Sequence, residues 1–452
     1  VAEPADATLR ARLVSIAQKE SRLPEVKAAL TEAFAALKDR PEAFDVAMTT
    51  GRLLRDDLAS EEEAADWFRL AFLRRPGEPQ VVDALSTLYA RLSRFGDLAL
   101  LYENLGDLEQ DEAERLSWYF KAYDVVRFRV KDATGAGEIL KKVLDQDPGN
   151  RGALEGLESI ARETSDAGAL GLWLSRRAEV TTLAPERRAT LLELAGVQQG
   201  PLNDPAAAIE TLRGLLETDL QCAEAWQRLE ELYVATNRWE ELASLYEQQA
   251  DASVSREEKV AALKKAAGVR ESRLEDSAAA VQLLRRLLEV DESNAYAFFR
   301  LGELLESAND AAGLAELLAA RLAHSAGTAE QVDLHARVGT LWATRLGDDA
   351  RALEHFKAAL AADPFHVPAR RGMEALLDSP VAAMEAALAL EGVYEGAGEH
   401  GSLCGVLLRE IPLMVGNAER EAVRMRIAEL RSERLDDVPG AMDMLGEVLM
   451  DA

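Results

Sequence analysis

Histidines are the first residues in this sequence to consider for metal binding or catalysis. The chain has five of them, His324, His335, His355, His366 and His400. No two are four residues apart, the spacing that places two imidazoles on one face of a helix, and none has a cysteine or carboxylate at ligand spacing. We therefore expect no metal site and no cofactor.

Paired carboxylates are the second candidate for chemistry. Asp145 and Asp147 form a D-x-D pair of the kind that some metal-dependent glycosyltransferases use, but other aspartates occupy the same turn further along the chain, namely Asp219, Asp291 and Asp363. A recurring helix-ending turn explains the pair better than catalysis does. The sequence also lacks a glycine-rich phosphate loop, a G-x-S-x-G elbow and a Cys-His arrangement. We predict no catalytic residues and no enzyme activity.

The cysteines and the net charge limit the partners further. Cys222 and Cys404 are far apart in sequence, so we expect free thiols rather than a disulfide or a zinc knuckle. A net charge of -28 repels nucleic-acid phosphates and anionic lipid headgroups. We therefore expect no nucleic-acid partner and no direct membrane insertion. A basic protein segment would be attracted to this charge, although a solvated acidic surface that maintains solubility also accounts for it.

An internal repeat defines the elements that carry these residues. Asp132, Asp204, Asp276 and Asp348 recur at equal intervals, and apolar residues follow each in the same register. The composition is 48% hydrophobic and only 6% aromatic, rich in the alanine, leucine, glutamate and arginine that favour helices. Repeats of a few tens of residues are typical of solenoids, whose units bury their apolar faces against each other. We predict an all-α protein.

Residues 204–275 resolve into four short helices. Asp204 is placed to cap the first, with Pro205 in its opening turn, and Asn237 marks the end of the second. Ser255 precedes the fourth, with Glu258 at capping-box spacing. Each helix has one apolar stripe, so sequence neighbours must pack as antiparallel hairpins. Small residues at one repeated position are expected at close helix crossings; they are Ala64, Ala136, Ala208, Ala280 and Ala352.

The segment VGTLWATRLGDDARALEHFKAALAADP resembles the tetratricopeptide repeat. Val338, Gly339 and Trp342 match the signature of that family's first helix, and the second helix is matched by Ala352, Phe356, Ala359 and Pro364. WQRLEELYVATNRWEELASLYEQQA matches more loosely. The resemblance implies a right-handed α-solenoid of about twelve stacked hairpins, in which the 72-residue period holds two hairpins.

The domain prediction is a single solenoid over residues 1–452. Asp437 begins a further copy 89 residues after Asp348, which indicates an insertion that we place at about 376–388, around Pro380, as an extra short helix. It is either a tolerated surface insertion or a bend or docking element. The repeat begins and ends in mid-unit, so we expect this sequence to be a fragment of a longer chain.

In the tetratricopeptide family the first helix of each hairpin lines a concave surface, which implies that surface as the binding site here. The matching positions are Phe120, Lys121, Arg127, Phe128, Lys264, Lys265, Tyr296, Phe299, Arg300 and Glu303. The helix LSWYFKAYDVVRFRV holds more aromatic residues than one buried stripe can use, so at least one should face outward. Because these aromatics could also belong to the core, the sequence leaves both readings open.

The leading functional hypothesis is a non-catalytic scaffold that binds a protein segment on this concave face. A self-assembling or structural component of an envelope or motility complex is the alternative, and an α/α-type enzyme a third. No membrane-spanning run or signal peptide is evident, and we expect a cytoplasmic protein. The residue usage resembles that of bacterial proteins.

Overall fold

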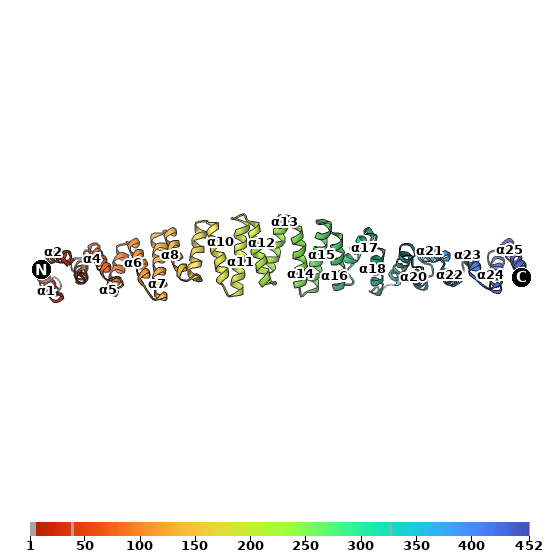
Figure 1. The fold of residues 1–452 in the computed structure, drawn as a ribbon, viewed down its shortest axis with the longest axis horizontal. Helices are drawn as coiled ribbons and strands as arrows, with labels where there is room; N and C mark the ends of the chain where they lie inside the picture. Colours follow the sequence, from red (N-terminus) through yellow and green to blue (C-terminus); the bar gives the residue numbers. More distant parts are fainter. Residues whose placement is uncertain (1–5, 38–39, 325–327, 452) are drawn as a thin grey trace. The chain divides into compact units, whose positions relative to one another are not determined.

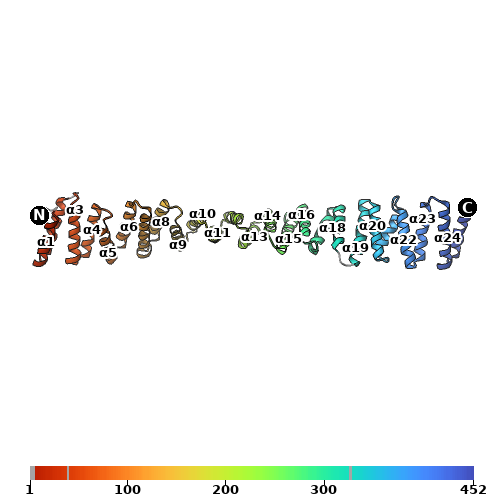
Figure 2. The same ribbon diagram turned by 90° about the horizontal axis from the view of Figure 1, so that it is seen from below.

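The structure is a computed structural model, and it describes residues 6–37, 40–324 and 328–451. Within these ranges the chain forms α-helices and short helical turns but no strand, which confirms the all-α prediction. Figures 1 and 2 show successive helices packed side by side. None of the described helices combines the length and apolar character needed to cross a bilayer. The chain divides into two compact units, residues 1–228 and 229–452.

The first unit is built of helices joined by short connections. It contains α1 (Ala7–Glu20), α2 (Leu23–Leu37), α3 (Ala43–Arg52), α4 (Glu61–Arg74), α5 (Pro79–Arg91), α6 (Phe95–Leu108), α7 (Glu112–Asp124), α8 (Ala133–Gln146), α9 (Arg151–Glu163), α10 (Ala167–Val180), α11 (Ala184–Gln199) and α12 (Pro205–Thr218). The π-helical turns η1 (Leu53–Asp57) and η2 (Val125–Val130) extend α3 and α7. α13 (Ala223–Ala235) runs from this unit into the next.

The second unit continues in the same manner. It contains α14 (Trp239–Ala252), α15 (Arg256–Ser272), α16 (Ser277–Val290), α17 (Ala295–Ser307), α18 (Ala311–His324), α19 (Thr328–Leu341), α20 (Asp349–Ala362), α21 (Val367–Ala375), α22 (Ala383–Ala397), α23 (His400–Glu410), α24 (Asn417–Arg434) and α25 (Val438–Asp451). Three short turns complete it: η3 (Trp342–Leu346), η4 (Leu376–Asp378) and η5 (Ile411–Leu413).

The repeated aspartates all begin helices. Asp132, Asp204, Asp276 and Asp348 cap α8, α12, α16 and α20, and each Oδ1 accepts a hydrogen bond of 3.0 Å from the backbone N–H three residues later. An N-cap satisfies an N–H that lacks a partner within the helix and stabilises it by about 1 kcal/mol. The aspartate position therefore sets where this helix begins in successive copies.

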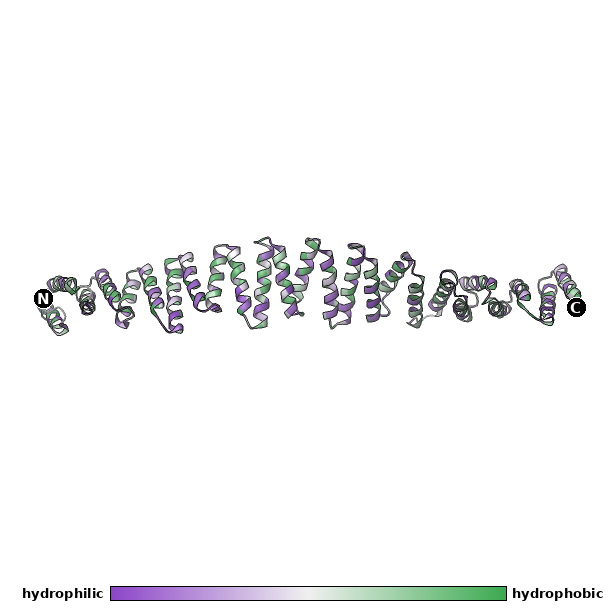
Figure 3. Ribbon diagram, in the orientation of Figure 1, coloured by the Kyte–Doolittle hydropathy of each residue, from purple (hydrophilic) through white to green (hydrophobic). Residues whose placement is uncertain are grey.

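Small residues allow the helices to approach each other. The five repeated alanines of the sequence pattern, from Ala64 to Ala352, are all fully buried. At Gly372 a Cβ atom would lie 2.2 Å from Cζ of the buried Phe356 ring. Figure 3 shows that each helix carries both polar and apolar stretches, as expected when only one side of a helix is buried. The core is thus a series of interhelical contacts that runs along each unit.

The additional helix in the last copy lies later than the sequence indicates. Residues 376–388, where we predicted the insertion, form η4 and the start of α22. α22 keeps the register of α18, because Ala383 follows Ala311 by one full period. Four helices, α21 to α24, separate α20 from α25, whereas three separate α16 from α20. By this register the additional helix is α23 with η5.

Candidate functional site

The ten predicted binding residues lie on odd-numbered helices: α7 with its extension η2, α15 and α17. In the first unit, Phe120 is half-buried and packs against the hydrophobic core, so it contributes to folding. Lys121 is exposed, and its Nζ lies 3.8 Å from the ring centroid of Trp118. Phe128 is 64% exposed and is the outward-facing aromatic residue of this helix. Its ring makes an edge contact with Tyr123, with 6.2 Å between centroids.

The second unit brings three of the predicted residues together on two helices. Lys264 on α15 places its Nζ 4.2 Å from the ring centroid of Tyr296 on α17. Phe299 follows Tyr296 by one turn and is 62% exposed. Lys264 forms no ion pair with any of the residues that the structure describes. We call Lys264, Tyr296 and Phe299 the Tyr296 cluster; it combines an available ammonium group with an exposed aromatic surface.

The other predicted cations are already paired with carboxylates of neighbouring odd-numbered helices. Arg127 pairs with Glu163 of α9, and Lys265 Nζ lies 3.0 Å from Glu230 Oε2 of α13. Arg300 pairs with Glu271 of α15 and also with Glu303 of its own helix. Similar pairs join other odd-numbered helices: Arg151 with Glu186, Arg162 with Glu193, and Arg345 with Glu306. We call this series the interhelix ion-pair ladder.

One ladder carboxylate also fixes an aromatic side chain. Glu230 accepts a hydrogen bond from Tyr246, and burial together with this bond raises the pKa of the Tyr246 hydroxyl. Lys265 Nζ lies 5.0 Å from the same ring centroid. Lys265 is therefore held by a carboxylate and an aromatic face, which favours a structural role over partner binding.

The structure also brings together two histidines that sequence spacing did not connect. His335 on α19 and His355 on α20 are 20 residues apart, and their Nδ1 atoms lie 3.0 Å from each other. Burial lowers the pKa of both imidazoles. Two neutral rings can share one N–H···N hydrogen bond. Within the described residues, no group of three or more potential ligands is arranged to hold a metal ion.

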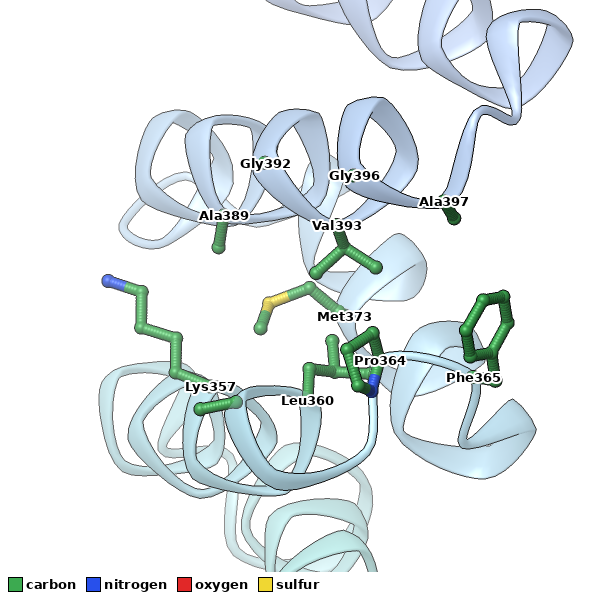
Figure 4. Close-up of a pocket in the computed structure, with 11 residues that line it drawn as sticks. Lys357, Leu360, Pro364, Phe365, Met373, Ala389, Gly392, Val393, Gly396 and Ala397 are labelled. Atoms are coloured by element: carbon green, nitrogen blue, oxygen red, sulfur yellow. The ribbon is translucent and has the colours of Figure 1, made fainter.

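Grooves between even-numbered helices are the other surface feature. The groove in Figure 4 has a volume of about 460 Å³ and lies between α20, α21 and α22, where Gly392 and Gly396 contribute no side chain. A groove of about 420 Å³ between α16, α17 and α18 is its counterpart one period earlier. Glu289 and Glu292 of the earlier groove correspond to Ala361 and Pro364 in the later one, which is therefore less polar. The sequence did not indicate either groove.

Comparison with known proteins identifies one repeat directly. Residues 225–260, which include α13 and α14, match the family model of the tetratricopeptide repeat. This match confirms the resemblance derived from the sequence. No curated protein sequence matches the chain.

Three solved structures are similar to the chain at low sequence identity. Naa15/Naa10 bound to HypK-THB has 13% identity and a TM-score of 0.30, and the match covers 97% of this chain and 68% of that one. YrrB, a TPR protein with an unusual peptide-binding site, has 20% identity, a TM-score of 0.21 and coverages of 41% and 91%. The human IFIT1 dimer with m7Gppp-AAAA has 14% identity, a TM-score of 0.24 and coverages of 87% and 94%. Since all three TM-scores are below 0.5, none of them assigns a ligand to this chain.

Proposed function

We propose that this chain, which belongs to the tetratricopeptide-repeat family, is a non-catalytic scaffold that binds a segment of another protein along its odd-numbered helices. Such helices present side chains at regular intervals to an extended or helical peptide. The observation that carries the proposal is the Tyr296 cluster. Its exposed Phe299 ring follows Tyr296 by one helical turn, and the Tyr296 ring is contacted by Lys264, a cation that has not been neutralised. Exposed aromatic rings and cations are typical of protein interfaces.

The ion-pair ladder supports the Tyr296 cluster as the place where the partner segment binds. Arg127, Lys265 and Arg300 were candidates for binding, but each would have to give up a carboxylate to contact a partner. Lys264 would give up only its contact with Tyr296. The proposed anchor is therefore Phe299, one helical turn after the Tyr296 ring that Lys264 contacts. In the first unit, Phe128 with Lys121 is a separate candidate contact.

The chemistry of the partner follows from the surface as a whole. Exposed rings such as Phe299 and Phe128 favour a segment that carries apolar side chains. The net charge of -28 attracts positively charged segments over a distance and disfavours nucleic acid. We propose a protein segment of positive net charge that carries apolar anchors and, opposite Lys264, a carboxylate or carbonyl oxygen to accept from the ammonium group; it is bound without a cofactor.

The test compares two phenylalanines of equal exposure on different surfaces. Phe299 and Phe365 are both 62% exposed, but Phe365 follows α20 and lines the groove of Figure 4. We expect Phe299→Ala, combined with Lys264→Ala, to abolish capture of a partner from a lysate of the source cell, as read by mass spectrometry. Phe365→Ala should capture it as wild type does.

Circular dichroism is the control for folding, since both side chains are exposed and neither change should reduce helix content. If the Phe365→Ala variant lost the partner while the Phe299 variant retained it, binding would belong to the grooves between the even-numbered helices. If both variants captured the same proteins as wild type, the role of the Tyr296 cluster would be refuted.

A further inference from the structure

The groove of Figure 4, which we call the α20–α22 groove, lacks polar side chains that its counterpart carries one period earlier. Four such side chains are absent: Glu289, Glu292, Arg321 and His324 correspond to Ala361, Pro364, Val393 and Gly396. In the earlier groove two of them pair, with His324 Nδ1 3.3 Å from Glu292 Oε2. All four differences replace a polar side chain by an apolar one or by none, so the α20–α22 groove offers an apolar surface.

The α20–α22 groove has a defined end on each side. Figure 4 shows Val393 pointing into the groove, with Phe365 at one end and Lys357 at the other. Phe365 is 62% exposed, and its ring centroid lies 5.1 Å from Cζ of Arg370, a contact that holds the ring in place. Lys357 Nζ lies 2.8 Å from Glu385 Oε2, so this pair joins α20 to α22. The groove therefore runs along the two helices between an exposed aromatic ring and an ion pair.

Two glycines of the groove are not required by the fold. Gly392 and Gly396 lie on successive turns of α22 and are exposed, and a Cβ atom added at either would meet no described atom within 4 Å. At Gly372, by contrast, a Cβ atom would clash with Phe356. Glycine destabilises a helix relative to alanine, so intramolecular packing does not account for this pair. The bare backbone of α22 allows close approach of another helix, because the distance between packed helices depends on the side chains at their contact.

The charge around the groove selects the kind of occupant. α22 carries three glutamates and no basic residue. Residues 349–397, which include α20 to α22, contain eight Asp and Glu against four Lys and Arg, a net charge of -4. Glu354 is exposed on α20, one turn before Lys357, and forms no ion pair within the described residues. A second copy of the chain would bring like charges together here, whereas a segment with cations beside its apolar face complements this surface.

We propose that the α20–α22 groove docks an amphipathic helix of another protein, with apolar side chains on one face and lysine or arginine along its flanks. The apolar face fills the groove between Phe365 and Val393, and the helix crosses α22 at Gly392 and Gly396. Its cations lie beside Glu354 and along α22. This site is separate from the Tyr296 cluster, which lies on α15 and α17, and it goes beyond the function proposed for that cluster.

The test measures binding of a synthetic peptide by fluorescence anisotropy. The peptide has the length of α20, 14 residues, with leucines on one helical face and lysines on the other. Every chain in the test carries Phe299→Ala and Lys264→Ala, so that the Tyr296 cluster does not bind the probe. We expect saturable binding of one peptide per chain. Gly392→Gln with Gly396→Gln fills the groove without a clash and should weaken binding by about tenfold or more, and Phe365→Ala should also weaken it.

The matched control is Gly401→Gln with Gly405→Gln on α23, where two exposed glycines have the same spacing and the same free space; it should leave binding unchanged. A peptide with glutamates in place of the lysines should bind much more weakly.

Three results would overturn the proposal. The first is the absence of saturable binding, or equal binding by the filled and unfilled grooves. The second is equal binding of the lysine and glutamate peptides, which would remove the charge argument. The third is a dimer of the unmodified chain in sedimentation velocity that the substitutions at Gly392 and Gly396 abolish, which would assign the groove to a second copy. Because the Tyr296 cluster is altered in every chain that meets the peptide, none of the peptide results bears on the scaffold test.

Discussion

Replacing Glu410 by glutamine should stabilise the chain at pH 8 far more than at pH 5. Glu410 lies on the additional helix α23 and is 3% exposed. Its carboxyl group is hydrogen-bonded to Glu391 of α22, whose Oε2 lies 2.7 Å from Arg426 Nη1 of α24. Burial, reinforced by the neighbouring Glu391 carboxylate, raises the pKa of Glu410 from 4.5 to about 7. The protonated carboxyl can then donate to Glu391.

The sign follows from proton binding. Between pH 4.5 and 7 the folded state retains a proton that the unfolded state has released, so the free energy of unfolding falls as the pH rises through this window. The shift in pKa corresponds to about 3 kcal/mol, since one pH unit is about 1.4 kcal/mol. Glutamine does not ionise, so it removes the free-energy cost of a buried Glu410 carboxylate, and its amide keeps an N–H donor towards Glu391. We expect a gain approaching about 3 kcal/mol at pH 8 and about 1 kcal/mol or less at pH 5.

Hydrogen exchange on peptides from α22 to α24 measures this gain, because opening in a repeat array is local. At pH 8 the Glu410→Gln variant should exchange up to about 100-fold more slowly than wild type. Glu429→Gln, an exposed change on α24, is the control and should leave exchange unaltered. Equal exchange in wild type and Glu410→Gln at pH 8, or a larger gain at pH 5 than at pH 8, would refute the reasoning.

Three further variants test the buried histidine pair of the second unit and the space around two glycines. Burial lowers the pKa of His335 and His355. The free energy of unfolding should therefore fall as the pH drops below 6.5, because the unfolded state takes up protons first. In a variant with both His335→Gln and His355→Gln, the free energies of unfolding from urea titrations at pH 7.5 and 5.5 should differ less than in wild type. Gly372→Ala should lower the melting temperature by several degrees, at a cost of about 1–3 kcal/mol, because its Cβ would clash with Phe356. Gly214→Ala, where a Cβ atom meets nothing within 4 Å, should leave stability unchanged or raise it.

The repeat pattern was sufficient to predict which elements form and which residues they bury. Aspartates at a constant spacing become N-caps, and the alanines that follow them are fully buried, because both depend on local sequence and on the nearest helices. The binding site itself stays a prediction, because the structure shows only how far each candidate residue is exposed. Phe128 and Phe299 are exposed, as binding requires, whereas Phe120 is half-buried and packs against the core. The resemblance to the tetratricopeptide repeat predicts which side of a helix a residue lies on. How far its side chain is exposed depends also on the residues of the next hairpin.

The position of the additional helix shows why boundaries were harder to predict. Pro380 marked a break in the helical pattern, but the break belongs to η4, which ends α21 and leaves α22 in register with α18. The extra residues follow later, at α23, whose own start has no proline and no capping side chain. Sequence spacing could indicate the size of the insertion because Asp348 and Asp437 both cap helices, α20 and α25.

The ion-pair ladder had no signature in the sequence because its partners are not separated by a fixed distance. Arg127 and Glu163 are 36 residues apart, whereas Arg300 and Glu271 are 29 apart. Long, flexible side chains accept such variation, and exposed pairs contribute only about 0–1 kcal/mol each. Their effect on recognition is larger than on stability, because a partner that used one of these cations would have to leave a carboxylate unpaired. Selective binding is therefore expected where the ladder leaves a cation available, at Lys264, whose ammonium group lies over the ring of Tyr296, one helical turn before the exposed Phe299.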